Sequence, residues 1–314
     1  MKLLQFYLPG QGTRLGLLYD GLVHDLTEAE PAYNSFLALL EHAGGQAATL
    51  ERFARELCAR VPGSATYAWR DLDRMPDPSL PHLLMPVFSP EVWAFGVTYR
   101  RSAEARDADL GKNLAPGKDG PAGPVANIYD RVYRSKRPEC FFKATASRCV
   151  GPHGQICIRS DSDLTACEPE LAYVLGANRE IVGYTACNDV SAWDLERENP
   201  LYLPQSKIYA GCCALGPVIV TPAEVNDPYS LDINCSIIRG GEVIFNAAIS
   251  SSRINRTFDQ LNEYLYRDNP IPLGTVVSTG TGIMAPNELC LRDGDTVQIG
   301  VEGIGILSNP VRKL

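Results

Sequence analysis

Short hydrophobic runs separated by turn-forming residues dominate the second half of the chain. Residues 171–175 and 181–187 read as two buried strands joined by the turn-prone Gly176-Ala177-Asn178. Residues 237–245 read as a hairpin on a Gly-Gly turn. One stretch, 257–267, instead spaces Phe258, Leu261 and Leu265 as one face of a helix. The pattern predicts an α+β chain whose larger part is mostly β.

The first part of the chain has a different pattern. Residues 3–8 and 15–19 have strand character, and residues 33–42 and 50–61 space their apolar side chains as helices do. Gly10-Gln11-Gly12 is expected to be a plain turn, because a dinucleotide fingerprint needs a third glycine and a following helix. These elements predict a small α+β unit.

Proline density rises after this unit and marks a linker, at Pro76, Pro78, Pro81 and Pro86. We therefore expect an N-terminal domain over residues 1–85 and a larger domain over 86–314. The larger domain opens with a strand at 92–97. Residues 102–127, which follow it, are charged, small and glycine-rich, so we expect a mobile loop that is a candidate lid.

Composition narrows the function classes. The 314 residues are 45% hydrophobic, with a net charge of −8 and no lysine- or arginine-rich run, which argues against a nucleic-acid binder. No window approaches the roughly 18 apolar residues of a membrane span, and no signal peptide is evident, so we expect a cytoplasmic protein. The ten cysteines lack a CxxC pair and are expected to be reduced, buried hydrophobes rather than zinc ligands.

Three carboxylates stand out as candidate metal ligands. Glu168 and Glu170 lie two residues apart at the start of one predicted strand, so their side chains share a face. Asp189 ends the next predicted strand. An isolated Glu-x-Glu is more often a solvated edge, but together the three can converge on one cation. Carboxylates without nearby Cys or His suit Mg²⁺, with Mn²⁺ or Ca²⁺ as substitutes.

These residues resemble the fumarylacetoacetate hydrolase family, whose core carries a Glu-x-Glu pair and an Asp roughly twenty residues later as ligands of one divalent metal. The resemblance runs from about Phe95 to the C-terminus. Within the family the chain looks most like the branch of 2-keto-3-deoxy-pentonate (xylonate or arabinonate) dehydratases. The segments that carry this likeness are 96–99, 137–143 and 198–207.

The resemblance implies a fold and an assembly. It implies a mixed β-roll or β-sandwich core with flanking helices, and residues 1–85 as the variable N-terminal domain. It implies that the metal lies in a cleft of the core, and that the protein is a homodimer or a dimer of dimers.

One departure from the family bears on the reaction. Hydrolytic members activate water with a His-Glu dyad near the lid, whereas residues 98–106 contain no histidine. We therefore expect dehydration of a 2-keto-3-deoxy sugar acid, a keto-deoxy-pentonate giving 2,5-dioxopentanoate. Two alternatives stay open: a hydrolase or decarboxylase of an acylpyruvate or related β-dicarbonyl acid, and a catalytically silent metal-binding homologue.

The resemblance also implies roles for individual side chains. Lys207 is the candidate for stabilising a developing oxyanion, and Lys143 for supplying a second charge. Glu104 is a candidate proton-transfer group, although it falls one place short of the family's glutamate. The candidates for binding the 2-oxo acid substrate are Tyr99, Arg106, Ser162, Gly280 and Thr281.

The residues that follow the metal aspartate leave a choice open. Asp194 and Glu196 either orient metal ligands or cap a helix that begins after Asp194, and the cap is preferred. Trp193 is expected to be packing.

Overall fold

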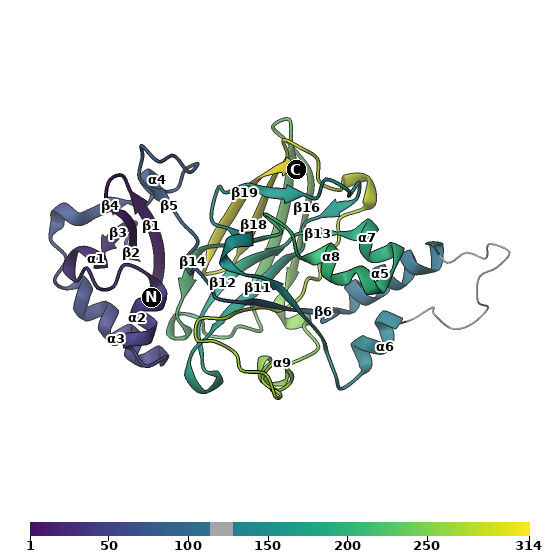
Figure 1. Cartoon of the computed structure of the whole chain (residues 1–314), viewed down its shortest axis with the longest axis horizontal. Helices are drawn as coiled ribbons and strands as arrows, with labels where there is room; N and C mark the ends of the chain where they lie inside the picture. Colours follow the sequence, from purple (N-terminus) through teal and green to yellow (C-terminus); the bar gives the residue numbers. More distant parts are fainter. Residues whose placement is uncertain (114–127) are drawn as a thin grey trace.

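The structure is a computed structural model and describes residues 1–113 and 128–314. A small N-terminal unit lies at one end of the molecule, a large β body forms the middle, and helices α5 and α6 lie at the other end (Figure 1). Among the described residues, no helix is long and apolar enough to cross a membrane.

The N-terminal unit is a curved antiparallel sheet covered by helices. The predicted helices 33–42 and 50–61 correspond to α2 and α3, with Ser35 capping α2. Apolar side chains from these helices and from β1 and β2 belong to one core cluster, which continues into the body with residues such as Val174 and Leu215. The elements are β1 (Lys2–Leu8), β2 (Gly12–Tyr19), β3 (Leu22–Asp25), α1 (Leu26–Ala29), α2 (Phe36–His42), α3 (Ala47–Cys58), β4 (Thr66–Ala68), α4 (Trp69–Leu72) and β5 (His82–Leu83).

The strands of this unit continue into the sheet of the body. The sheet runs in the order β4-β3-β2-β1-β14-β12-β11-β17-β6-β7, and β1 joins β14 through the pairs Lys2↔Val220 and Leu3↔Ile219. A short strand, β8, pairs with the other end of β14. The body strands of this sheet are β6 (Val92–Gly96), β7 (Glu139–Ala144), β8 (Cys149–Val150), β11 (Pro169–Leu175), β12 (Ile181–Asp189), β14 (Cys213–Val220) and β17 (Val276–Ser278).

A second sheet packs on the first, and the two share one apolar core, with Leu171 and Tyr173 on one side and Ile233 and Leu307 on the other. The predicted hairpin is β15–β16, turned by Gly240 and Gly241 at positive φ. The second sheet contains β9 (Ile156–Ile158), β15 (Asp232–Arg239), β16 (Glu242–Ser250), β18 (Thr296–Val301) and β19 (Gly305–Lys313). β10 (Thr165–Ala166) and β13 (Ser191–Ala192) form a separate pair.

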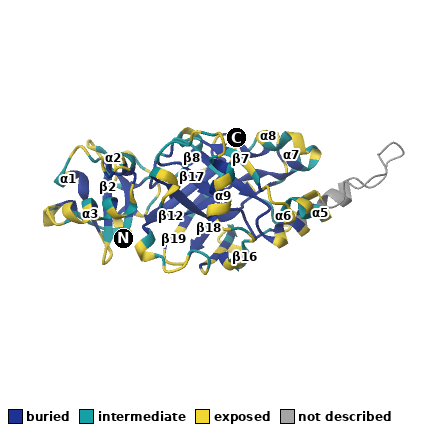
Figure 2. Cartoon of the chain, turned by 90° about the horizontal axis from the view of Figure 1, so that it is seen from below, coloured by how far each residue is buried: buried dark blue, intermediate teal, exposed yellow. Residues whose placement is uncertain are grey.

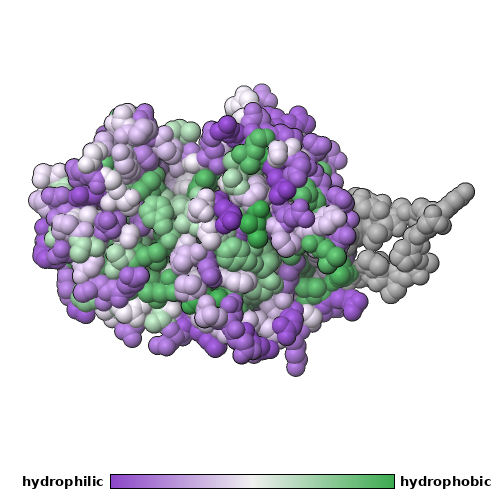
Figure 3. All heavy atoms as spheres, in the orientation of Figure 1, coloured by the Kyte–Doolittle hydropathy of each residue, from purple (hydrophilic) through white to green (hydrophobic). Residues whose placement is uncertain are grey.

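This architecture confirms the predicted class, a mostly β, α+β fold. Figure 2 shows the strands of the body buried and the outer faces of the helices exposed. The predicted helix at 257–267 is α9 (Phe258–Leu265), and a capping box from Thr257 and Gln260 stabilises its N-terminus. The face in Figure 3 is mixed in polarity, with hydrophobic side chains gathered toward its middle.

The expected loop at 102–127 is wrong where the structure describes it. Residues up to 113 belong to α5 (Arg100–Asn113), and α6 (Ile128–Arg134) packs beside it. Residues 114–127 lie outside the described residues, so the lid stays a prediction. Two further helices, α7 (Trp193–Glu198) and α8 (Leu203–Lys207), follow β13.

Candidate metal centre and active site

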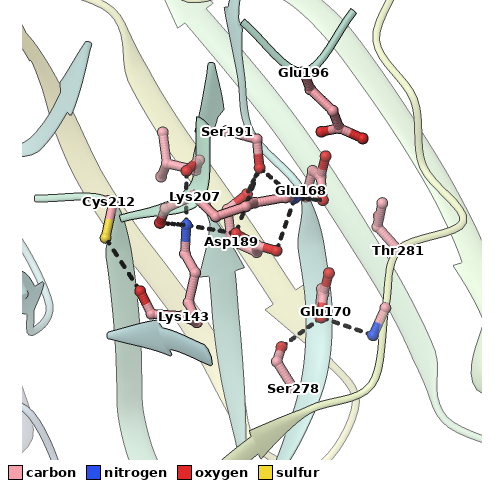
Figure 4. A network of polar contacts seen from close by, with 12 residues as sticks. Lys143, Glu168, Glu170, Asp189, Ser191, Glu196, Lys207, Cys212, Ser278 and Thr281 are labelled. Carbon is pink, nitrogen blue, oxygen red and sulfur yellow. Dashed lines mark hydrogen bonds and ion pairs between the residues drawn. The ribbon is translucent and has the colours of Figure 1, made fainter. Parts of the chain in front are cut away.

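The register of β11 and β12 brings the three predicted ligands together. Pro169 pairs with Asn188, and the Asp189 amide donates to the Glu168 carbonyl over 3.0 Å. One carboxylate oxygen from each of Glu168, Glu170 and Asp189 lies within 4.8 Å of the others, and all three residues are buried (Figure 4). Three anionic oxygen donors with no thiolate or imidazole fit the preferences of Mg²⁺.

Glu168 is fixed by donors on both of its oxygens. Trp193 Nε1 and Arg106 Nη2 lie 2.7 and 3.2 Å from Oε1, and Lys207 Nζ lies 2.8 Å from Oε2. Burial opposes ionisation, but Lys207 and Arg106 outweigh it and lower the pKa of Glu168 to about 2. The expectation that Trp193 only packs is therefore wrong, and Arg106 lies at the cluster.

Asp189 is held by the two lysines that the sequence indicated. Lys143 Nζ lies 2.6 Å from Oδ1, and Lys207 Nζ lies 3.0 Å from Oδ2. Lys207 also donates to Ser191 Oγ, whereas Lys143 donates to the carbonyls of Val190 and Lys207. Burial alone would lower the pKa of each ammonium group, but the effect of the neighbouring carboxylates is larger and raises the pKa above its usual value. Both lysines therefore stay charged. Lys143, fully buried, acts on Asp189 rather than reaching outward.

Glu170 is held by the loop that follows β17. Ser278 Oγ and the Gly280 amide both donate to Oε2, the latter over 2.7 Å. Gly280 has a φ of 92°, and a side chain there would overlap Thr98. Burial and the charges of Asp189 and Glu168 raise the pKa of Glu170 to about 8. The Gly280 amide, which the sequence assigned to the substrate, donates its hydrogen bond to this carboxyl group.

The other predicted site residues do not all lie at the cluster. Thr281 is buried and donates to the carbonyl of Pro169, beside the cluster. Tyr99 is buried with an unpartnered hydroxyl, and burial together with the charge of Glu170 raises its pKa. Ser162 bonds Thr165 and Asp194, and none of its hydrogen bonds reaches the cluster.

The structure contradicts the expected role of Glu104. Its side chain is 63% exposed and pairs with Arg100, one turn earlier on α5, over 2.8 Å. Arg106, two residues further along the helix, turns inward instead and is buried. Two residues along a helix is about half a turn, so the two side chains face opposite ways.

Two carboxylates near the cluster were given no catalytic role by the sequence. Glu139 on β7 pairs with Gly96 on the neighbouring strand β6. Because Gly96 has no side chain, there is room beside it for the Glu139 carboxylate. Its Oε2 atom is buried without a hydrogen-bond partner, and burial raises its pKa against the opposing charge of Arg106. Segment 137–143 carries part of the family likeness, but nothing in its hydrophobic and polar pattern distinguishes Glu139 as a site residue.

Glu196 is the second of these carboxylates. α7 begins at Trp193, with Ala192 as its cap and no side-chain cap bond, so the expected helix cap is wrong. Asp194 instead accepts hydrogen bonds from the amides of Asp163 and Leu164. Glu196 lies 2.9 Å from Arg106 Nη1, which is also 3.9 Å from Glu139.

The fold and the site together define a protein built to hold a divalent cation with oxygen ligands, in a buried position surrounded by fixed charges. A sequence model described as fumarylacetoacetate (FAA) hydrolase C-terminal matches residues 120–312. The chain belongs to the fumarylacetoacetate hydrolase family.

Individual relatives support this family assignment. The chain is 50% identical over 229 residues, covering 73% of this chain and 74% of the relative, to a 2-dehydro-3-deoxy-D-arabinonate dehydratase from Saccharolobus solfataricus. It is 40% identical to a probable 2-keto-3-deoxyxylonate dehydratase from Haloferax volcanii, covering 95% of both chains. A solved 2-keto-3-deoxy-D-arabinonate dehydratase, complexed with magnesium and 2,5-dioxopentanoate, superposes with a TM-score of 0.81 at 38% identity, covering 100% of this chain and 99% of that one.

Proposed function

We propose that this protein is a Mg²⁺-dependent dehydratase of a 2-keto-3-deoxy sugar acid, and that it converts a keto-deoxy-pentonate into 2,5-dioxopentanoate. The observation that carries the proposal is the buried Glu168, Glu170 and Asp189 cluster. It lies in a chain that superposes along its full length on a dehydratase complexed with magnesium and that product. The relatives support the substrate class, and the side chains support the chemistry.

Glu168, Glu170 and Asp189 would hold the cation. When bound, Mg²⁺ would polarise the keto group of a 2-oxo acid and favour loss of a proton from the adjacent carbon. The protein fixes the geometry beforehand, because each carboxylate is already held by its own donors, among them Trp193 for Glu168 and Lys143 for Asp189. Such preorganisation is what allows fixed charges to stabilise a transition state.

Glu139 is our candidate for the general base. It is a partly buried carboxylate with one unpartnered oxygen, and the pKa raised by burial makes it a better proton acceptor at neutral pH. The C3 proton passes to Glu139, the C4–oxygen bond breaks, and Glu139 gives this proton to the departing hydroxyl, which leaves as water. The buried ammonium of Lys207, 2.8 Å from Glu168 and 3.0 Å from Asp189, would stabilise the negative charge that develops during this step.

For a pentonate, the first product is an unsaturated 5-hydroxy-2-oxo acid. It isomerises to 2,5-dioxopentanoate when its C5 hydrogen and hydroxyl proton move to C3 and C4. The balance is loss of one water, with no oxidant or reductant.

The direct test is turnover with Mg²⁺ on 2-keto-3-deoxy-pentonates beside acylpyruvates, with the products followed by mass spectrometry. We expect loss of 18 mass units, one water, from a keto-deoxy acid, and loss of that activity by at least about a hundredfold in Glu139→Gln. Gain of water with cleavage of an acylpyruvate would contradict the proposal and favour the hydrolase alternative. Full Mg²⁺ binding without turnover on any 2-oxo acid would favour the catalytically silent homologue.

We also propose a cytoplasmic homodimer or dimer of dimers in which residues 1–85 form the N-terminal domain and 86–314 the catalytic domain. The support for the assembly is the family likeness, together with apolar side chains that stay exposed on the second sheet. Val243 and Ile306 are 59% and 60% exposed. Light scattering would give the mass of the assembly.

A further inference from the structure

Glu196 is a buried carboxylate whose hydrogen bonding is incomplete. It is 5% exposed. Its Oε1 atom lies 2.9 Å from Arg106 Nη1 and 3.5 Å from the hydroxyl of Tyr129, while Oε2 is buried with no partner. A buried anionic oxygen without a hydrogen bond is costly, so its presence points to a partner that arrives with a ligand.

The position of Glu196 places that partner in the active site. Arg106 bridges Glu196 to Glu168, and its guanidinium also lies 5.6 Å from the centre of the Tyr129 ring. Glu196 is nevertheless outside the set of carboxylates close enough to share one cation. In Figure 4 it lies beside Glu168, on the side of the cluster away from Lys143. The unpartnered oxygen therefore lies beside a metal ligand without belonging to the ligand set.

We infer that Glu196 accepts a hydrogen bond from a hydroxyl group on the C4–C5 end of the substrate. This contact selects keto-deoxy sugar acids over 2-oxo acids with apolar tails. The inference rests on the proposed function and deepens it. An ionised carboxylate only accepts hydrogen bonds, and a hydroxyl supplies the donor that Oε2 lacks. A substrate without the hydroxyl leaves the carboxylate buried and unpaired, which is the strongest way for a site to reject an analogue.

Substrate recognition and proton removal belong to different carboxylates in this site. Glu139 comes from β7 and Glu196 from α7, and Arg106 lies between them. A 2-oxo acid such as 2-oxobutyrate offers C3 hydrogens but no hydroxyl. With this compound Glu139 removes a C3 proton and returns a deuteron from D₂O, and no C–O bond breaks. The site therefore has a second activity, C3 hydrogen exchange, that does not need Glu196.

The experiment compares two readouts in Glu196→Gln and Glu196→Ala with Mg²⁺ present. One readout is kcat/KM for dehydration of the keto-deoxy-pentonate, and the other is the rate of C3 deuterium exchange into 2-oxobutyrate followed by NMR. We expect dehydration to fall on the order of tenfold in Glu196→Gln and a hundredfold in Glu196→Ala. Exchange should stay within about twofold of the wild type. Glu198→Gln, an exposed position on the same helix, is the matched control and should change neither rate.

The outcomes are distinguishable. Equal loss of both rates would mean that Glu196 only anchors Arg106, and would overturn the inference. Unchanged dehydration in Glu196→Ala would overturn it as well. A wild-type protein that exchanges C3 hydrogens but dehydrates no keto-deoxy acid would instead overturn the proposed function. Thermal melting of each variant with and without Mg²⁺ separates these results from misfolding.

Discussion

Replacing Glu170 by Gln tests the metal assignment most sharply, because the structure predicts a large loss of metal binding and little change in folding stability. In the metal-free protein the pKa of Glu170 is raised to about 8, so this carboxyl is mostly protonated at pH 7. The neutral amide of Gln has nearly the same shape and can still accept the hydrogen bond from the Gly280 amide. We therefore expect the free energy of unfolding without metal to change by less than about 1 kcal/mol.

Metal binding should respond quite differently. At a Mg²⁺ concentration 100 times the wild-type Kd, binding stabilises the wild type by about 2.7 kcal/mol, which for a chain of this length raises Tm by about 4 °C. Loss of an anionic ligand should weaken Mg²⁺ binding more than about a hundredfold, since removing even an outer partner of a ligand costs about 10- to 100-fold. At the same Mg²⁺ concentration the variant should then gain less than about 1 °C.

The assay is thermal melting of both proteins with EDTA and with Mg²⁺, alongside isothermal titration calorimetry. Glu242→Gln, an exposed position on the β15–β16 hairpin, carries the same charge change and should behave as the wild type. A full Mg²⁺-induced rise of Tm in Glu170→Gln would refute the assignment of Glu170 as a ligand. Strong destabilisation of the metal-free variant would refute the inference that Glu170 is protonated at pH 7.

Four further predictions rest on the surroundings of Glu170, Glu139 and Lys143. Because Mg²⁺ requires ionised Glu170, its affinity should rise about tenfold per pH unit up to about pH 8, with about 0.9 proton released per ion at pH 7 by calorimetry in two buffers. Without metal, Glu170 keeps its proton up to about pH 8 in the folded state but only up to about pH 4.5 in the unfolded chain. The free energy of unfolding without metal, measured by urea titration, should therefore fall as pH rises between these two values. Gly96→Ala puts a methyl group where the Glu139 carboxylate lies, so kcat should fall on the order of a hundredfold while circular dichroism stays unchanged; normal kcat would contradict the role of Glu139. Lys143→Met removes one partner of buried Asp189 and should lower the free energy of unfolding by about 3 kcal/mol in EDTA, with part restored by Mg²⁺.

The metal ligands could be predicted because their geometry is local. Glu168 and Glu170 share a face through the two-residue period of a strand, and Asp189 meets them because one short turn joins β11 to β12. Lys207 entered only through the family likeness, since no local pattern places a residue of α8 beside this hairpin.

Glu139 and Glu196 could not be predicted as site residues, because long-range packing positions them. Glu139 and Glu196 lie on elements far from the hairpin in sequence and meet at Arg106. Arg106 itself lies on a helix that the pattern missed, because α5 carries few apolar residues. A buried ion-pair network holds that helix to the body, and hydrophobic periodicity does not report such a network.

The short pairing of β1 with β14 has a consequence for aggregation. One edge of β14 is occupied by β12, the strand that ends in Asp189. Among the described residues, the opposite edge pairs with β8 at one end and with β1 at the other, and no strand pairs with its middle. An uncovered strand edge is a template for pairing with other chains. The N-terminal unit therefore shields the sheet that carries the metal ligands, and a protein that lost it would present an adhesive edge one strand away from its own active site.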